Sequence, residues 1–342
     1  MKNTHYTIRD VARLAGVSHQ TVSRVINKVE KVSPGTREKV ERVIEELNYQ
    51  PNAIARSMAR GKTRTLACLS PNLTDFTFAS IIEGAEQKAR EVGYYLLSSS
   101  CSDEDTFAEI VHELVGRRRI DGLIIINPYI DYRYEFIPAH FPTIFVGDES
   151  KDDEIAWVAL DDELAGYMAV KHLIGLGHRE ILCIQGTISD ACTQNRTLGY
   201  FRALQEEQIS PKETLLFCGD WTATSGYKSI ETALEKDQKF SAVFAQNDRM
   251  AIGAMHALRN ANIQIPQQVS VIGFDDMPLA SYFDPPLTTI RQDFNQIGQE
   301  AARTLIHKIE HPDENETSHR IAVELVERQS TALKSGGEHI ER

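Results

Sequence analysis

The sequence has no apolar run long enough to cross a membrane and no apolar segment near its start that is typical of a signal peptide. A membrane helix needs about 20 consecutive apolar residues, and a signal peptide needs an apolar core after its basic start. The first six residues instead lead directly into a charged segment. We therefore expect a cytoplasmic protein without a membrane partner.

Cysteines are few and widely scattered, at Cys68, Cys101, Cys183, Cys192 and Cys218. Their number is odd and no two of them have C-x-x-C spacing, which argues against a disulfide framework and against a zinc cluster. We expect reduced, mostly buried thiols and no bound metal.

Motifs of common enzyme classes are missing. The sequence has no P-loop, no H-E-x-x-H and no G-x-S-x-G motif. The glycines of Gly175-x-Gly177-His178 follow a helical pattern and do not open a helix, so they do not form a dinucleotide-binding fingerprint. We predict no cofactor, no catalytic residues and no enzymatic activity.

Charge is distributed unevenly along the 342 residues, a length that favours more than one folding unit. The net charge is -12 at pH 7, yet residues 1–64 carry 13 Lys and Arg against 6 Asp and Glu, a net of +7. The remaining residues therefore carry -19. A basic head on an acidic body is typical of a protein that meets nucleic acid with one end.

The basic head has the pattern of three short helices. Thr7 and Asp10 form a T-x-x-D capping box for the first helix, which ends at Gly16. Ser18 can cap a second helix after this glycine turn, and Ser33 can cap a third. Two helices joined by a glycine turn are the helix-turn-helix unit of DNA-binding proteins. A small bundle with a polar second helix is the alternative, but the ordered caps and the basicity favour DNA.

The second helix supplies the residues that would contact bases. His19 and Gln20 stand at its start, where base edges are read. The fork of Arg24 suits guanine, and the amide of Gln20 suits adenine. The candidate DNA-binding residues of the head are Thr7, Ser18, His19, Gln20, Thr21, Ser23, Arg24, Asn27 and Ser33.

Two stretches of the head resemble the N-terminal domain of the lactose-repressor/galactose-repressor family of transcriptional regulators. They are TIRDVARLAGVSHQTVSRVIN and VSPGTREKVERVIEELNYQPNAIARSMA. The resemblance implies that His19, Gln20 and Arg24 select the operator. It also implies that residues 51–64 form a hinge helix on DNA. This segment is too short to be a stable helix in water alone, so we expect it to be ordered only when it is held by DNA and by its dimer mate. Met58 would be the minor-groove wedge, where the family more often has leucine. Asn52 and Ala55 are further candidates, and a flexible linker is the alternative.

The body alternates short apolar runs with helical patterns, as in Leu66–Leu69, Gly122–Ile126 and Val269–Ile272. Runs without polar alternation suit parallel strands covered on both faces, hence doubly wound sheets that bind ligands beyond the carboxyl ends of their strands. The stretches GDWTATSGY, AQNDRMAIGAMHAL and SVIGFDDMPLASYFDPPLTTIRQDFNQIGQ resemble the same family. The resemblance implies a periplasmic-binding-protein-like α/β body with two lobes, three crossings between them and a sugar-sized effector in the cleft.

These patterns divide the chain into residues 1–50 as the helix-turn-helix head, 51–64 as the hinge, 65–332 as the effector-binding and dimerisation domain, and 333–342 as a disordered tail. The family match implies that Trp221 stacks on the sugar while Arg196, Asn247 and Asp275 bond to its hydroxyls. Other candidates are Phe76, Phe78 and Phe294 as wall residues, and Asp148, one step beyond the position where galactoside-responsive members carry an acid. Each has a structural alternative as a helix cap, core residue or surface ion pair.

We therefore expect a homodimeric repressor of a carbohydrate-utilisation operon, released from a pseudo-palindromic operator by a mono- or disaccharide. The C-terminus lacks the apolar heptads of a tetramerising coiled coil, which favours the dimer. A purine corepressor, a phosphoprotein partner and a cytoplasmic sugar-binding protein without a DNA role are the alternatives.

Overall fold

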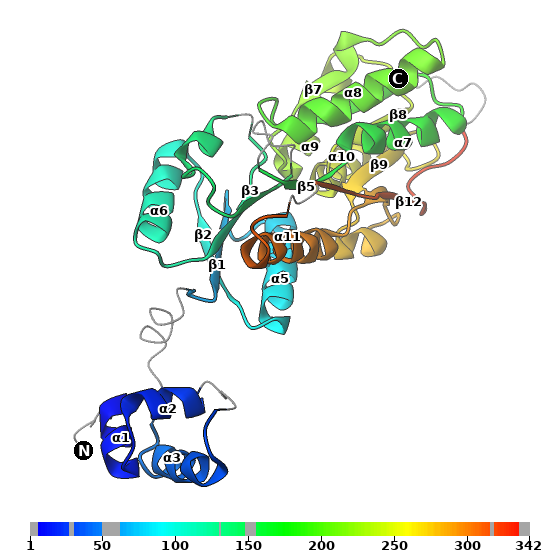
Figure 1. Cartoon of the computed structure of the whole chain (residues 1–342). Coiled ribbons are helices and arrows are strands. Elements are labelled where there is room, and N and C mark those ends of the chain that lie inside the picture. Colours follow the sequence, from blue (N-terminus) through cyan, green and yellow to red (C-terminus); the bar gives the residue numbers. More distant parts are fainter. Residues whose placement is uncertain are drawn as a thin grey trace. The chain divides into compact units, whose positions relative to one another are not determined.

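The structure is a computed structural model of the chain. It describes residues 6–26, 31–49, 62–129, 131–147, 155–314 and 318–334. The chain forms two compact units, Met1–Arg64 and Thr65–Arg342 (Figure 1). No helix in the described part of the chain is long and apolar enough to cross a membrane.

The first unit contains the three predicted helices, α1 (Ile8–Ala15), α2 (His19–Ile26) and α3 (Pro34–Glu46). They enclose a small core that includes the fully buried Val11, Ala15, Val22 and Val40. Gly16 has a φ of 64°, the left-handed conformation that lets α1 end and the chain turn.

All three predicted residues stand at the N-terminus of their helix, and two of them form the predicted hydrogen bonds. The N–H of Thr7 donates to the Asp10 carboxylate at 3.0 Å, and the Ser18 hydroxyl accepts the Thr21 N–H at 3.1 Å. Ser33 stands at the predicted cap position, but its hydroxyl pairs with the Thr36 hydroxyl at 2.8 Å and caps no backbone N–H. Ser33 is therefore the N-cap residue of α3, as predicted, but without a side-chain hydrogen bond to the backbone.

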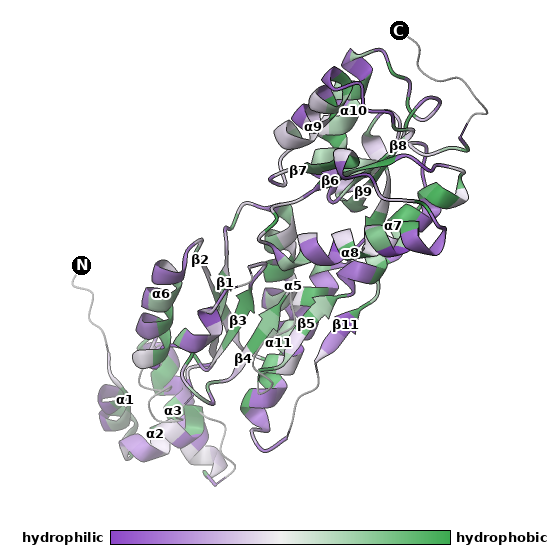
Figure 2. Cartoon of the chain, turned by 90° about the horizontal axis from the view of Figure 1, so that it is seen from above, coloured by the Kyte–Doolittle hydropathy of each residue, from purple (hydrophilic) through white to green (hydrophobic). Residues whose placement is uncertain are grey.

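The second unit contains two six-stranded sheets (Figure 2). The first sheet has the order β11-β5-β4-β3-β1-β2 and is parallel throughout. Its strands are β1 (Thr65–Ser70), β2 (Tyr95–Ser100), β3 (Gly122–Ile126), β4 (Thr143–Val146), β5 (Trp157–Leu160) and β11 (His319–Ile321).

The second sheet has the order β12-β10-β9-β8-β6-β7, and only its edge strand β12 is antiparallel to its neighbour. Its strands are β6 (Ile181–Gln185), β7 (Leu216–Cys218), β8 (Ala242–Ala245), β9 (Ser270–Asp275), β10 (Thr288–Arg291) and β12 (Glu324–Val326). The doubly wound, two-lobed α/β body is therefore confirmed.

Helices cover both faces of each sheet and define two lobes. The first lobe has α5 (Phe76–Glu91), α6 (Glu104–Gly116), α11 (Phe294–Glu310) and the 3-10 helix η1 (Arg133–Phe136). The second lobe has α7 (Asp162–Gly175), α8 (Ala191–Glu206), α9 (Ala223–Glu235) and α10 (Asp248–Asn260), with the 3-10 helices η2 (Glu213–Leu215) and η3 (Pro278–Tyr282). All five residues of β3 are buried, which explains its unbroken apolar run.

The chain passes between the lobes three times, as the family resemblance implied. It leaves the first lobe after β5, returns between β10 and α11, and leaves again between β11 and β12. The crossings therefore fall at residues 160–162, 291–294 and 321–324. These positions bring the carboxyl ends of the strands of both sheets to one cleft.

Candidate functional site

The surface of α2 carries the predicted DNA-reading residues. His19, Gln20 and Arg24 are exposed, whereas Val22 and Val25 on the opposite face are buried. Thr7, Ser18 and Ser33 are also exposed, and Thr21 and Ser23 are half-buried. Asn27, Asn52, Ala55 and Met58 lie outside the described residues.

A cavity of about 520 Å³ lies between the two lobes of the body. Six of the predicted effector residues line it: Phe78, Arg196, Trp221, Asn247, Asp275 and Phe294. Phe76 does not line the cavity. Its ring packs edge-to-face against Phe294, with centroids 6.1 Å apart, and lies partly buried against the core of the first lobe. Asp148 lies outside the described residues.

Arg196 on α8 is buried, and three contacts hold its guanidinium group in place. Its Nε donates to the Asp162 carboxylate at 2.8 Å, and its Nη1 donates to the Gln246 carbonyl at 2.6 Å. Its guanidinium carbon lies 3.6 Å from the ring centroid of Phe274. Burial raises the pKa of Asp162, and the adjacent guanidinium opposes this shift. Arg196 is therefore in a buried ion pair at the cavity wall, not in a surface ion pair.

Trp221 is half-buried and has a φ of 67°. Its Nε1 donates to the Asp190 carboxylate at 2.7 Å. Its ring lies against Gly186, where any Cβ would overlap it. Its carbonyl accepts a hydrogen bond from the Asn247 amide at 3.1 Å. The position of Trp221 is thus fixed by a hydrogen bond at the ring nitrogen, by packing of the ring on Gly186 and by a hydrogen bond at its backbone carbonyl.

Asn247 has a structural role beside its place in the cavity wall. Its side-chain oxygen accepts the Met250 N–H at 2.8 Å and so caps α10. Asp248, the next residue, points into the second lobe and accepts hydrogen bonds from the Thr289 hydroxyl at 2.6 Å and the Met277 N–H at 2.8 Å. Asp276 pairs with Arg291 and Arg328 away from the cavity.

Asp275 ends β9 with a φ of 117°, a left-handed conformation that is strained for a non-glycine residue. It is only 7% exposed, and one carboxylate oxygen accepts the Gln292 amide at 2.7 Å. Burial raises the pKa of Asp275 well above its usual value, and the Arg196 guanidinium opposes the shift. The strain and the burial are typical of a binding site.

The buried Asp248 gives an unusual pH dependence. Burial raises the pKa of Asp248 to about 7, whereas the pKa of an Asp in an unfolded chain is about 3.9. The folded state therefore holds this proton more tightly, and the stability it contributes is lost as the pH rises from about 4 through 7. We expect Asp248→Asn to gain stability relative to the wild type over that range. Urea unfolding at several pH values measures this difference, and a difference that stays constant with pH would contradict it.

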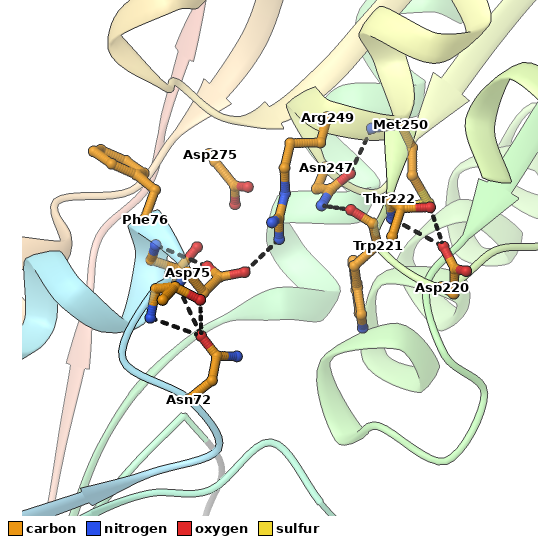
Figure 3. Close-up of polar contacts among 12 residues, drawn as sticks. Asn72, Asp75, Phe76, Asp220, Trp221, Thr222, Asn247, Arg249, Met250 and Asp275 are labelled. Atoms are coloured by element: carbon orange, nitrogen blue, oxygen red, sulfur yellow. Dashed lines mark hydrogen bonds and ion pairs between the residues drawn. The ribbon is translucent and has the colours of Figure 1, made fainter. Parts of the chain in front are cut away.

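One ion pair connects the lobes across the cavity, and the sequence patterns did not predict it. Asp75 precedes α5 in the first lobe, and Arg249 stands in the first turn of α10 in the second lobe. The Nη2 of Arg249 lies 2.5 Å from a carboxylate oxygen of Asp75 (Figure 3). The other oxygen of Asp75 caps α5 through the Thr77 N–H at 2.9 Å. We call the Asp75–Arg249 pair the clasp.

A double-mutant cycle tests the clasp. Asp75→Asn keeps the cap on α5 but removes the charge, and Arg249→Gln removes the guanidinium. We expect the two changes together to cost less stability than the sum of each alone, by about 0.5–1 kcal/mol, because Arg249 is partly exposed. Urea unfolding of the four proteins measures this coupling. The same cycle with Arg202→Gln, which is exposed on α8, should show no coupling.

Other cavity residues were also missed by sequence reasoning, namely Asn72, Asp162, Asp190, Asp220 and Gln292. Each of them stands within two residues of the end of a strand or the start of a helix, which is the available signal. A Ser, Asn or Asp in such a place is usually read as a cap or turn residue. The structure brings them together only because the crossings fold the two lobes over one cleft.

The chain joins a basic helix-turn-helix unit with an exposed α2 surface to a two-lobed ligand-binding body. This combination defines a class of ligand-responsive DNA-binding regulators. The family description "Bacterial regulatory proteins, lacI family" matches residues 7–52, and "Periplasmic binding protein-like domain" matches residues 170–331.

Individual relatives match over nearly the whole chain. The HTH-type transcriptional repressor PurR of Vibrio atlanticus is 34% identical, covering 94% of this chain and 97% of the relative. The ribose operon repressor of Escherichia coli is 34% identical, covering 95% and 99%. A crystal structure of the lac repressor dimer bound to operator and an anti-inducer has a TM-score of 0.89 at 32% identity, covering 96% and 100%.

The chain belongs to the lacI family of bacterial regulatory proteins. It is a DNA-binding transcriptional regulator of the repressor type. These relatives are named as repressors, which agrees with the expectation that the chain is not an enzyme.

Proposed function

We propose that the chain represses a carbohydrate-utilisation operon and that a small sugar in the cleft releases it from its operator. The fixed ring of Trp221 beside the polar groups of Arg196 and Asp275 supports this proposal most strongly. A sugar offers an apolar face to an aromatic ring and hydroxyls to carboxylate and guanidinium groups. One similar solved structure is a regulator in complex with cellobiose and another is a regulator with bound ribose, which favours the same class of ligand.

A purine corepressor is the second candidate, because several curated relatives are named as the repressor PurR. Calorimetric titration against sugars and purine bases separates the two candidates. Tight binding of hypoxanthine or guanine without any response to sugars would replace the carbohydrate with a purine.

The proposed assembly is a cytoplasmic homodimer whose two heads bind a pseudo-palindromic operator. The similar lac repressor, which was solved as a dimer bound to operator, supports this assembly. His19, Gln20 and Arg24 would read base edges, and residues 51–64 would form the hinge with Met58 as the wedge. We keep residues 1–50, 65–332 and 333–342 as the proposed head, effector domain and tail.

Effector and operator binding are linked in this mechanism. A sugar that lowers operator affinity must itself bind more weakly to the DNA-bound dimer, by typically about 5- to 150-fold. Equal sugar affinity with and without operator DNA would exclude the mechanism.

Selection of the purified protein on randomised duplex DNA at physiological salt tests the whole proposal. We expect an enriched palindrome that one sugar of a mono- and disaccharide panel releases. If no sequence is enriched under any condition, the repressor function is wrong and the body remains a ligand-binding protein.

Arg24→Ala tests the reading of bases by α2. Because a bidentate contact to guanine is lost, we expect a cost of about 1–3 kcal/mol at one base pair and relaxed specificity there. Binding measured on operators with each base pair changed in turn gives this pattern. Arg13→Ala, in which an exposed arginine of α1 is removed, is the matched control. A uniform loss on all operators would place Arg24 on phosphate.

A further inference from the structure

We infer that the cleft takes an uncharged, hydroxyl-rich ligand and excludes sugars that carry a phosphate or carboxylate group. This rests on the proposed function only in treating the cleft as the effector site. Three features of the described part of the body carry it: the balance of charge in the wall, the state of its arginines and the caps of the surrounding helices.

The cavity wall has more acids than bases. Its acidic members are Asp75, Asp162, Asp190, Asp220 and Asp275, and its basic members are Arg196 and Arg249. Among the described residues that line it there is no lysine, histidine or glutamate. An anion in this cavity would meet like charges where water is partly excluded and screening is weak.

Both guanidinium groups already have carboxylate partners. Asp162 neutralises Arg196 at 2.8 Å, and Asp75 neutralises Arg249 across the lobes at 2.5 Å. Recognition of a phosphate usually needs an arginine whose paired N–H groups are free to bind it. A phosphate at Arg249 would compete with Asp75, and one at the free Nη2 of Arg196 would meet a guanidinium whose charge Asp162 already offsets.

Of the remaining acids, Asp220 would repel an anion directly. Asp220 keeps its charge, because hydrogen bonds from Thr222 and Ser225 lower its pKa. Asp190 and Asp275 have no arginine within ion-pair distance among the described residues. Burial already disfavours their charged forms, and a neighbouring phosphate would disfavour them further.

Three helix N-termini at the cleft already hold a side-chain cap, and such ends often bind phosphate when they are open. Asp75 caps α5 by accepting the Thr77 N–H at 2.9 Å. Thr222 caps α9, and Asn247 caps α10. The fourth helix, α8, begins directly after the carboxylate of Asp190. A carboxylate therefore stands at the start of α5 and of α8, and a side-chain oxygen accepts one N–H in the first turn of α9 and of α10.

The polar atoms of the wall that have no partner within the protein can bind the hydroxyl groups of a ligand. In the described part of the chain, the second oxygen of Asp275 and the Nη2 of Arg196 have no hydrogen-bond partner. One accepts and the other donates, and a sugar hydroxyl can do both. The Trp221 ring lies in the same wall and can cover the apolar face of a neutral sugar.

Titration of the full chain with matched compounds tests this inference without DNA. The probes are ribose and ribose 5-phosphate, glucose with glucose 6-phosphate and glucuronate, cellobiose, and inorganic phosphate, all at constant ionic strength. We expect each sugar that binds to do so at least about tenfold more tightly than its charged form. We expect inorganic phosphate not to compete with a bound neutral sugar for the cleft.

Two variants show whether the wall charge causes the selectivity. Asp220→Asn removes one negative charge from the wall, so the ratio of sugar to sugar-phosphate affinity should fall. Asp237→Asn removes one charge from an exposed position outside the cavity and should leave the ratio unchanged. An equal ratio in wild type and Asp220→Asn would contradict a role of the wall charge.

The inference is overturned if a sugar phosphate or sugar acid binds more tightly than its parent sugar, if inorganic phosphate displaces a bound neutral sugar, or if no uncharged probe binds. Its failure differs from failure of the proposed function. The operator selection can fail while neutral sugars still bind, and an operator can be found whose release needs a charged ligand.

Discussion

Arg196→Ala is expected to abolish sugar binding and to lower the free energy of unfolding by about 3–5 kcal/mol. The variant leaves the buried Asp162 carboxylate without its partner and removes the group stacked on Phe274. It also frees the Gln246 carbonyl, which accepts from Nη1 at 2.6 Å. Urea unfolding measures the stability, and calorimetry with the effector measures the binding.

The two effects of this substitution can be separated. Arg196→Met combined with Asp162→Leu removes both charges, so stability should largely return while sugar binding stays lost. Arg202→Ala on the same helix removes an exposed ion pair with Glu163 and should change stability by less than about 0.5 kcal/mol. If Arg196→Ala costs no more than Arg202→Ala, the buried pair does not stabilise the second lobe.

The head could be predicted almost fully from sequence, because its determinants are local. The capping box of Thr7 and the turn at Gly16 each act over three or four residues. The apolar spacing then fixes which side of α2 is buried, and so leaves His19 and Arg24 exposed. At Ser33 the N-cap position was also predicted correctly, although its hydroxyl bonds with that of Thr36 and with no backbone N–H.

In the body, the sequence indicated strands only where apolar residues run without interruption. β10 was not predicted because its Thr288 and Thr289 are polar, although both are completely buried. They are accommodated by partners distant in sequence: the Thr289 hydroxyl donates to Asp248 at 2.6 Å, and Thr288 bonds with Thr331 at 3.1 Å. The short edge strands β11 and β12 also have no unbroken apolar run. They form because each pairs with a strand that is distant in sequence, β5 and β10 respectively.

The cavity shows the same division between local and distant causes. Phe78 lines it and Phe76 does not, although both stand in the first turn of α5 and pack against the same core of the first lobe. Sequence alone could not separate these two phenylalanines. The clasp joins residues 174 positions apart, and only the assembled lobes bring them into contact.

Gly186→Ala is expected to weaken sugar binding by about tenfold or more, although Gly186 has no side chain to contact the ligand. An added Cβ would overlap the Trp221 ring, so the ring must leave its position. The Nε1 hydrogen bond to Asp190 would then break. We expect a loss of stability of about 1–3 kcal/mol, as is typical of overpacking. Gly175→Ala, where a Cβ meets open space, is the matched control.

A second substitution distinguishes displacement of the ring from general damage to the lobe. In Gly186→Ala combined with Trp221→Ala the added methyl has room, so the double variant should be no less stable than Trp221→Ala alone. Sugar binding should remain weak in both, because the stacking ring is gone. If Gly186→Ala lowers stability equally with and without the tryptophan, the methyl acts on the β6 end and not on the ring. Fluorescence in a Trp157→Phe background, where Trp221 is the remaining tryptophan, reports the displacement directly.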